Sequence, residues 1–400
     1  MKAVKTIRDP IHGTIELTEL EIALIDTPEM QRLRNIKQNG FCYLVYPAMN
    51  STRFEHSLGV MHVAGRLANK LELDEDDKNL LRVSGLLHDI GHCAFSHTSD
   101  KILEKFNITH EENSIRIIQN SQISDILSSY GISPKEVSKL IVGDGKYGKI
   151  ISSEIDVDKM DYLIRDSYYA GVAYGIIDLE RILYGIKLVK ENLVVDVRSL
   201  EAVESLLISR NLMYQTVYRH HTKRIVERMF SEALKKFIEL ENLSCDEFIK
   251  MDDIDLISRM RNSEGYVRDM VDRIDKRRLF KKVFHEKLIM IEDAFRKELA
   301  ENFEEIQREI AQDFGIKEGY LLIDIPEMKL SEFEILIDEG NGVLRRIDEV
   351  SNLAKSLEKS ELEKLTFCIY AAKEELHKLK NFTPEDYFEL KQPKLSKFMK

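Results

Sequence analysis

The segment of residues 85–92, GLLHDIGH, limits the fold of this chain more than any other sequence feature. An apolar approach with helical spacing ends there in an adjacent imidazole and carboxylate, His88 and Asp89. His56 lies about thirty residues earlier, and Asp158 follows well downstream. All four residues are metal-ligand types, and they belong to three separate helical stretches. The sequence therefore predicts a helical core in which three helices bring these side chains together.

These two imidazoles and two carboxylates form a hard, mixed nitrogen and oxygen ligand set. Such a set suits divalent manganese, iron, nickel, zinc or magnesium, so the ligand types leave the identity of the metal open. A single histidine more often caps a helix, packs or lies on the surface. Here, however, seven of the eleven histidines fall within the first 110 residues. This clustering favours a metal centre that activates water.

A group of acid and base candidates accompanies the metal ligands. His88 and His92 are one helical turn apart, so one can bind metal while the other faces a substrate. His97, Asp100 and His110 are candidates to complete the acid and base group. Without the metal ligands, the simpler interpretation is that His92 and His97 cap helix ends or bond to backbone. With the ligands, we interpret them as catalytic.

Positions 158, 162 and 166 share one helical stripe, which places Asp158, Tyr162 and Asp166 on the same face. A phosphate at the metal, a sugar against the ring and a hydroxyl on the second carboxylate would fit this stripe. The alternative is a tyrosine packed between helices beside a solvated aspartate. Three basic residues are candidate phosphate clamps, although most basic side chains are simply solvated: Arg53, Lys159 and Arg210. The basic run 219–224 is an anion site, an intersubunit surface or a solvated helix.

The formal net charge of −11 argues against a general nucleic-acid or anionic-membrane binder, because phosphate backbones attract basic surfaces. The N-terminus lacks the apolar region of a signal peptide, and no apolar run is long enough to span a bilayer. The four cysteines are scattered and form no CxxC pair. We therefore expect a protein of the reducing cytoplasm.

Changes in sequence texture divide the chain into three expected segments. Residues 1–240 form the helical core, and 241–315 form a charged helical extension. Residues 316–400 form a small α+β lobe and a tail, because YLLIDIP and FEILID are short strand-like runs and the second precedes a glycine-rich turn. We expect the final segment, KQPKLSKFMK, to be mobile.

The chain closely resembles the HD-domain dNTP triphosphohydrolases in six segments that follow one another in order: DPIHGTIEL, IDTPEMQRLRNIKQ, RFEHSLGV, LLHDIGHCAFSH, THEENS and IDVDKMDYLIRD. Residues 5 to about 230 carry the resemblance, and the end of the chain resembles the family's C-terminal lobe more weakly. The resemblance implies a mainly α fold, an HD-domain helical fold with a small C-terminal α+β lobe.

The resemblance also implies roles for individual residues. The metal ligands would be His56, His88, Asp89 and Asp158. The acid and base group would be His92, His97, Asp100 and His110. The triphosphate would contact Arg53, Lys159 and Arg210. The deoxyribose would lie among Tyr162, Asp166 and Tyr218, with Gln38 at its 3′-hydroxyl and no space beside Tyr162 for a 2′-hydroxyl.

Some positions near the base differ from the mammalian member of the family, namely Asn39, Tyr214 and Arg219, so the base preference stays open. Three further residues match the family's activator site: Asp26, Gln31 and Arg34. They imply a nucleotide activator and a homo-oligomer, either a dimer or a tetramer.

We therefore expect an enzyme that hydrolyses a deoxynucleoside triphosphate to the deoxynucleoside and inorganic triphosphate. One alternative is an HD phosphohydrolase acting on another nucleotide or phosphoester, since fold and metal do not determine the substrate. Another is a nucleotide-sensing assembly protein with vestigial chemistry, which the complete ligand set disfavours. A cyclic-dinucleotide phosphodiesterase is disfavoured because no Gly-Tyr-Pro element follows the His-Asp pair.

Overall fold

The computed structural model describes residues 2–326, 333–340 and 342–391, without the side chains of His97, Lys101 and Glu104. The chain forms two compact units that alternate along the sequence. Unit 1 contains Met1–Lys223, Ile238–Arg259 and Ser331–Lys355, and unit 2 contains Arg224–Phe237, Met260–Leu330 and Ser356–Lys400. The expected mobile tail lies outside the described residues from position 392 onward.

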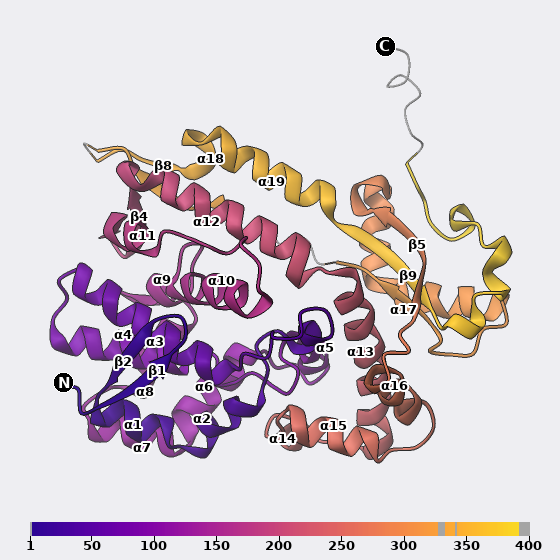
Figure 1. Cartoon of the computed structure of the whole chain (residues 1–400), viewed down its shortest axis with the longest axis horizontal. Helices are drawn as coiled ribbons and strands as arrows, with labels where there is room; N and C mark the ends of the chain where they lie inside the picture. Colours follow the sequence, from indigo (N-terminus) through magenta and orange to yellow (C-terminus); the bar gives the residue numbers. More distant parts are fainter. Residues whose placement is uncertain (1, 327–332, 341, 392–400) are drawn as a thin grey trace, which may run out of the picture. The chain divides into compact units, whose positions relative to one another are not determined.

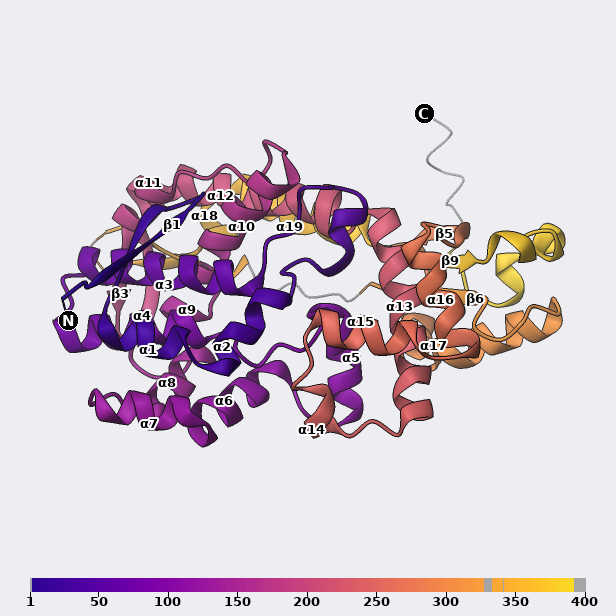
Figure 2. The ribbon, with the colours of Figure 1, turned by 60° about the horizontal axis from the view of Figure 1, so that its bottom comes forward.

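Three helices form the centre of unit 1: α3 (Arg53–Lys70), α4 (Glu75–Leu87) and α10 (Val157–Ala170). Each is preceded by a side chain that accepts a hydrogen bond from the first-turn backbone: Thr52, Asp74 and Asp156. Helix α3 packs against both α4 and α10 (Figures 1 and 2). Gly85 permits the close approach of α4, because a Cβ there would lie 3.2 Å from the backbone of Met61 on α3. The predicted meeting of three helices is therefore present.

An N-terminal hairpin and two short helices pack onto this centre. The hairpin joins β1 (Lys5–Asp9) to β2 (Gly13–Leu17) in antiparallel register, and α1 (Glu19–Ile25) and α2 (Pro28–Arg32) follow. Ile15 of the hairpin shares one apolar cluster with helix residues. Two 3₁₀ turns, Leu33–Asn35 and Gly40–Leu44, then lead to α3.

Further helices lie wholly within unit 1. They are α5 (His97–Lys105), α6 (His110–Asn120), α7 (Gln122–Ser129), α8 (Pro134–Ile141), α9 (Gly148–Ile151), α11 (Leu179–Gly185), α12 (Leu200–Met213), α14 (Cys245–Phe248) and α18 (Ile347–Val350). Helix α12 continues directly into a π-helical turn, Tyr214–Tyr218. Such turns are rare and often occur at functional sites. Three helices have residues in both units: α13 (His221–Glu241), α15 (Asp253–Arg261) and α19 (Asn352–Lys364).

A four-stranded sheet explains why residues 331–355 belong to unit 1. Its order is β3 (Ile186–Val189), β4 (Asn192–Asp196), β7 (Leu336–Asp338) and β8 (Leu344–Arg346). Strands β4 and β7 are parallel and distant in sequence, with Val194 opposite Leu336. Each compact unit is therefore built from several separate stretches of the sequence. The expected segments, by contrast, are consecutive: 1–240, 241–315 and 316–400. The division of the chain into these three segments stays a prediction.

Unit 2 contains a second sheet, whose order is β5 (Lys281–Lys287), β9 (Thr366–Ala371) and β6 (Leu321–Asp324). Both pairings are antiparallel, and α17 (Asp293–Asp313) packs against β6. Helix α16 (Gly265–Asp275) also belongs to this unit. The runs YLLIDIP and FEILID both contain strands, as predicted, but these strands are β6 and β7 of different sheets.

The expected fold class, mainly α with a small C-terminal α+β lobe, is confirmed. All four cysteines are free thiols. In the part of the chain that the structure describes, no helix is both long enough and apolar enough to cross a membrane.

Candidate metal centre and active site

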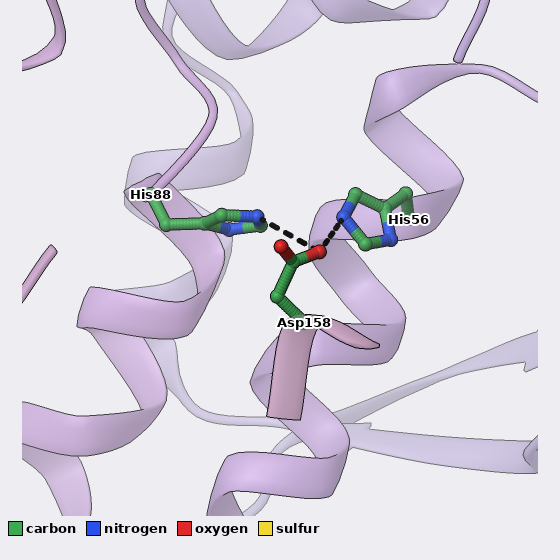
Figure 3. A group of neighbouring side chains, drawn as sticks. All are labelled: His56, His88 and Asp158. Carbon is green, nitrogen blue, oxygen red and sulfur yellow. Dashed lines mark ion pairs between the residues drawn. The ribbon is translucent and has the colours of Figure 1, made fainter. Parts of the chain in front are cut away.

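Three of the expected metal ligands converge at the centre of unit 1 (Figure 3). His56 lies in the first turns of α3, His88 follows the last turn of α4, and Asp158 lies in the first turn of α10. Nε2 of His56 is 2.9 Å from Oδ1 of Asp158, and Nε2 of His88 is 3.8 Å from the same oxygen. One carboxylate oxygen thus faces two imidazole nitrogens.

The fourth expected ligand, Asp89, lies beside this group. Its Oδ2 is 3.6 Å from Nε2 of His56, and its Oδ1 is 3.4 Å from Nε2 of His88. Asp89 is also ion-paired with Arg53, and Arg53 Nε donates to Oγ of Ser96 at 2.8 Å. Arg53 therefore holds a candidate ligand in place, and its expected contact with a triphosphate stays a prediction.

The donor set fits a divalent metal ion. Nε2 of His56 and Nε2 of His88 are buried, and neither meets an acceptor in hydrogen-bonding geometry among the described residues. The other nitrogen of each ring is anchored: His56 Nδ1 lies 2.8 Å from Asp161, and His88 Nδ1 lies 2.8 Å from the carbonyl of Gly85. An imidazole anchored through one nitrogen presents the other to a metal in a defined direction.

The electrostatics of the group also favour a bound cation. Burial lowers the pKa of His56, but the carboxylates of Asp158 and Asp161 outweigh burial and raise this pKa to about 10. The pKa of Asp158 is lowered in spite of burial, mainly by its contact with His56. The surrounding carboxylates therefore stabilise positive charge at this position, as a metal ion would supply it.

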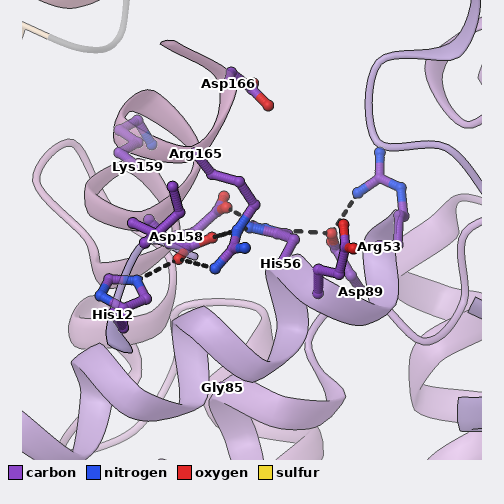
Figure 4. A network of polar contacts seen from close by, with 12 residues as sticks. His12, Arg53, His56, Gly85, Asp89, Asp158, Lys159, Arg165 and Asp166 are labelled. Atoms are coloured by element: carbon purple, nitrogen blue, oxygen red, sulfur yellow. Dashed lines mark hydrogen bonds and ion pairs between the residues drawn. The ribbon is translucent and has the colours of Figure 1, made fainter. Parts of the chain in front are cut away.

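Asp161 organises a second layer behind the ligands, and Figure 4 labels its partners His12, His56 and Arg165. It accepts hydrogen bonds from Nδ1 of His56 at 2.8 Å and from Nε2 of His12 at 2.6 Å. Arg165 donates to it through Nε at 2.8 Å and through a terminal nitrogen at 2.9 Å. Gly59 provides the space, because a Cβ there would collide with the Asp161 carboxylate. Despite burial, Arg165 and the two imidazoles hold the pKa of Asp161 well below its usual range.

The roles of Asp161, Arg165 and His12 do not follow from the sequence patterns described above. One signal was available, since Asp161 and Arg165 are one turn apart on the helix that carries Asp158. The part of His12 depends on where the N-terminal hairpin packs, which no local pattern reveals.

The expected acid and base residues form a neighbouring group. His92, Asp100 and His110 lie close enough together to share one small ligand. The rings of His92 and His110 are stacked with centroids 4.1 Å apart, and Nδ1 of His110 is 3.9 Å from Oδ1 of Asp100. Burial, aided by Arg53 and His110, lowers the pKa of His92 well below its usual value. The side chain of His97, the remaining member, lies outside the described residues.

The expected sugar contacts meet around Asp166. Tyr218 Oη donates to Oδ2 of Asp166 at 2.8 Å, and Nδ2 of Asn39 donates to Oδ1 at 2.8 Å. The rings of Tyr162 and Tyr218 make an edge-to-face contact with centroids 6.2 Å apart. Gln38 is buried, and its Oε1 has no hydrogen-bond partner among the described residues. The alternative in which Asp166 is solvated is wrong, since this side chain is buried.

The other two candidate phosphate clamps have internal contacts. Lys159 Nζ donates to the carbonyl of Ser153 at 2.8 Å and to Oδ2 of Asp156 at 2.9 Å. The guanidinium of Arg210 lies 4.3 Å from the ring centroid of Tyr214. Contact of either residue with a triphosphate stays a prediction.

The expected activator residues lie at the ends of α1 and α2. Nε of Arg34 donates to Oε1 of Gln31 at 2.9 Å, and the Arg34 guanidinium lies 3.7 Å from the ring centroid of Phe54. Asp26 is exposed at the C-terminal end of α1. Gln31 and Arg34 are thus in contact, and their binding of a nucleotide stays a prediction.

Most of the chain matches models of known protein families. Residues 53–166 match the family model described as the HD domain, and residues 177–399 match the model described as the HD associated region. The first match contains all four candidate metal ligands.

Similar proteins extend over nearly the whole chain. An uncharacterized protein of Methanocaldococcus jannaschii is 40% identical over 392 residues, which cover 96% of this chain and 82% of that protein. A Dictyostelium discoideum protein named deoxynucleoside triphosphate triphosphohydrolase SAMHD1 homolog is 28% identical over 394 residues, covering 88% of this chain and 75% of that protein. The crystal structure of a hypothetical protein from Aquifex aeolicus has a TM-score of 0.78 and 31% identity, covering 94% of this chain and all of that one.

Proposed function

The chain belongs to the HD-domain family of metal-dependent phosphohydrolases, and from this premise we propose that it hydrolyses deoxynucleoside triphosphates to the deoxynucleoside and inorganic triphosphate. One observation carries the proposal: the stripe along α10. Asp158 belongs to the metal group, Tyr162 lies one turn further along, and Asp166 is bonded to Tyr218 after a second turn. The named activity of the Dictyostelium relative supports the same substrate class.

We assign His56, His88, Asp89 and Asp158 as the metal ligands. A divalent ion held by them supplies positive charge that polarises a phosphoryl group and activates water. Asp161 orients His56, and Arg53 orients Asp89, so the ligands are in place before substrate arrives.

The neighbouring imidazoles supply the proton that the leaving group needs. His110, beside Asp100, passes a proton to the 5′ oxygen as it departs, and His92 supports it as a buried ring stacked against it. His97 remains a second candidate for this acid on the sequence alone. Losing such an acid typically lowers the rate by ~10²–10⁴-fold.

The substrate lies along the stripe with its phosphates toward the metal. Arg53, Lys159 and Arg210 contact the triphosphate, for which Lys159 must exchange part of its pairing with Asp156. Gln38 meets the 3′-hydroxyl, since its buried Oε1 needs a donor that the described residues do not provide. The ring of Tyr162 then occupies the space that a 2′-hydroxyl would need.

We further propose that a nucleotide activator binds at Asp26, Gln31 and Arg34 and promotes a homo-oligomer, a dimer or a tetramer. Helix α2 offers a physical link to the active site. Its Arg32 donates to the carbonyls of Ile90 at 3.1 Å and His92 at 2.8 Å.

The decisive experiment incubates the pure protein with each deoxynucleoside and ribonucleoside triphosphate in the presence of Mn²⁺, Fe²⁺, Ni²⁺, Zn²⁺ or Mg²⁺. Release of deoxynucleoside and intact inorganic triphosphate supports the proposal. Turnover of another nucleotide or phosphoester alone favours the broader phosphohydrolase alternative. Nucleotide binding without any turnover favours the sensing and assembly alternative.

A further inference from the structure

A buried carboxylate from the HD associated region joins two segments of the active site. Oδ1 of Asp253 accepts a hydrogen bond from the backbone N–H of Phe95 at 2.6 Å, and Oδ2 accepts one from the N–H of Lys37 at 3.0 Å. The Asp253 residue is only 7% exposed. Asp253 belongs to unit 1 and is 158 positions from Phe95 in the sequence.

Both amides belong to segments that lead directly to proposed substrate or catalytic residues. Lys37 precedes Gln38 and Asn39, which face the sugar position. Phe95 follows His92 by three positions, in the connection between α4 and α5. A carboxylate that accepts from both segments therefore sets the distance between the sugar contacts and the acid and base group.

The Phe95 segment needs such support because its backbone is strained. Phe95 and Ser96 have φ angles of 59° and 46°, a strained conformation that side-chain-bearing residues rarely adopt. The N–H of Phe95 is fixed by Asp253, and Oγ of Ser96 bonds to the carbonyl of Lys37 at 3.2 Å and accepts from Arg53. The surrounding contacts thus hold a conformation that the isolated segment would leave.

Arg32 also connects the segment around Asp253 to the loop that follows α4. Its guanidinium donates to the carbonyl of Met251 at 3.1 Å as well as to those of Ile90 and His92. Residues 251–253 are therefore connected to the loop after α4 through two charged side chains, the guanidinium of Arg32 and the carboxylate of Asp253.

Asp253 is suited to this task in its ionised form. The charged groups that face it are Lys37, Arg32 and the neighbouring Asp252. Burial raises the pKa of Asp253 to about 6, while the two backbone hydrogen bonds and Lys37 oppose the rise. At neutral pH the carboxylate is ionised and accepts through both oxygens.

We propose that Asp253 is a positioning residue of the active site, which joins the segment before Gln38 to the segment after His92. The proposal rests on the proposed function, and it gives the HD associated region a part in catalysis. Asp253 does not touch the reacting atoms. It acts through the backbone that carries the residues which do.

The test compares Asp253→Asn with Asp252→Asn. The asparagine at position 253 has nearly the same shape as the aspartate, but it turns its NH₂ group toward one of the two backbone N–H groups. The second variant removes the same charge one position earlier. The side chain of Asp252 bonds to Asn35 and to backbone N–H groups in the first turn of α15, which an asparagine can also cap. It serves as the matched control.

We expect Asp253→Asn to lower kcat by ~10–100-fold, since small misplacements of catalytic groups have effects of this size. Hydrogen exchange should accelerate by roughly 5- to 150-fold at whichever of the two amides, Lys37 or Phe95, then faces the NH₂ group, the equivalent of one unpaired buried N–H. Bound metal should remain at the parent level. Asp252→Asn should match the parent in all three measurements.

Three outcomes overturn the proposal. Unchanged exchange at both amides shows that Asp253 does not hold the segments, and faster exchange with parent kcat shows that the link does not serve catalysis. A proportional loss of metal and kcat indicates a merely structural role. If the parent does not hydrolyse deoxynucleoside triphosphates, the proposed function fails, while the exchange data still decide the link and kcat is then compared on the substrate that the parent does use. If Asp253→Asn does not fold, Asp253→Glu takes its place, since it keeps the charge but moves the carboxylate away from the two N–H groups; parent kcat and parent exchange in that variant overturn the proposal.

Discussion

Nδ1 of His56 donates to Oδ2 of Asp161 across 2.8 Å, and this buried contact turns the opposite nitrogen of the ring toward Asp158. The carboxylate also accepts from His12 and Arg165, so it cannot move without breaking other buried bonds. The direction of the His56 ring is therefore determined by a residue that has no place in the ligand set. Metal affinity should depend on that residue.

Asp161→Asn should weaken metal binding by about 10–100-fold, because the loss of such an outer partner typically has this effect on affinity. Isothermal titration calorimetry of the apoprotein with metal measures this affinity. The exposed Asp125 of α7 supplies the control, and Asp125→Asn should bind metal as the parent does. Equal affinity in Asp161→Asn would contradict the role of the Asp161 carboxylate in metal binding.

Much of the candidate metal centre was predictable because its members obey local rules. His88 and Asp89 end an apolar helical run, and Asp158, Tyr162 and Asp166 repeat at intervals of one turn. The rule for helical spacing is enough to place such residues on one face. It was also enough to predict the mainly α fold.

The remaining features depend on packing between distant segments. His12 reaches Asp161 across 149 positions only because the N-terminal hairpin packs beside α3. The strand in FEILID was predictable from its alternation of apolar and polar residues. Its parallel pairing with β4 was not, since such a pattern does not indicate which strand will be the neighbour. Asp253 belongs to the segment expected to be a charged helical extension, yet it is buried and bonded to the backbone beside the candidate active site.

Asp166 should make the stability of the protein depend on pH near neutrality. Burial raises its pKa from the ordinary 3.8 to about 6, although Tyr218 and Asn39 oppose the rise through hydrogen bonds. A raised carboxyl pKa means that the folded chain holds the proton more tightly than the unfolded chain does. The associated stabilisation is complete below the unfolded value and is lost as pH rises through about 6.

The lost stabilisation amounts to about 3 kcal/mol by the usual conversion of 1.36 kcal/mol per pKa unit. Asp166→Asn cannot titrate, so its Tm relative to the parent should rise between pH 4 and pH 7. Thermal unfolding of both proteins in a chelator measures this difference. Tyr218→Phe removes one opposing hydrogen bond and should move the parent's transition to higher pH. A difference in Tm that does not change with pH would contradict the assignment.

A nucleotide activator should change both the assembly and the rate. Because Gln31 and Arg34 already contact one another and match an activator site by resemblance, a guanine or deoxyadenine nucleotide should promote a larger oligomer and raise activity. Light scattering measures the mass, and the rate is followed with a different substrate nucleotide. Arg34→Ala should weaken both responses, whereas Arg66→Ala, which alters a surface ion pair with Glu180, should not. Unchanged mass and rate on adding nucleotide would leave a constitutive enzyme.

Tyr162 should discriminate between deoxyribose and ribose because it lies one turn after the proposed metal ligand Asp158 on the same helix. Its ring also packs edge-to-face against Tyr218, so it has little freedom to retreat from a ribose. A 2′-hydroxyl would clash, or lose its hydration without gaining a partner. Such an unpaired buried group costs about 1–3 kcal/mol, which corresponds to roughly 5- to 150-fold in kcat/KM between dGTP and GTP.

Tyr162→Ala should reduce that preference, because the shortened side chain leaves room for the extra hydroxyl. The control is Tyr168→Ala on the same helix, since the Tyr168 side chain is 60% exposed and should leave the preference unchanged. The measurement is kcat/KM for dGTP and GTP in the parent and both variants, with bound metal determined in each. If the parent shows no preference for the deoxy sugar, Tyr162 does not exclude the 2′-hydroxyl. The substrate would then have to be sought among other nucleotides and phosphoesters.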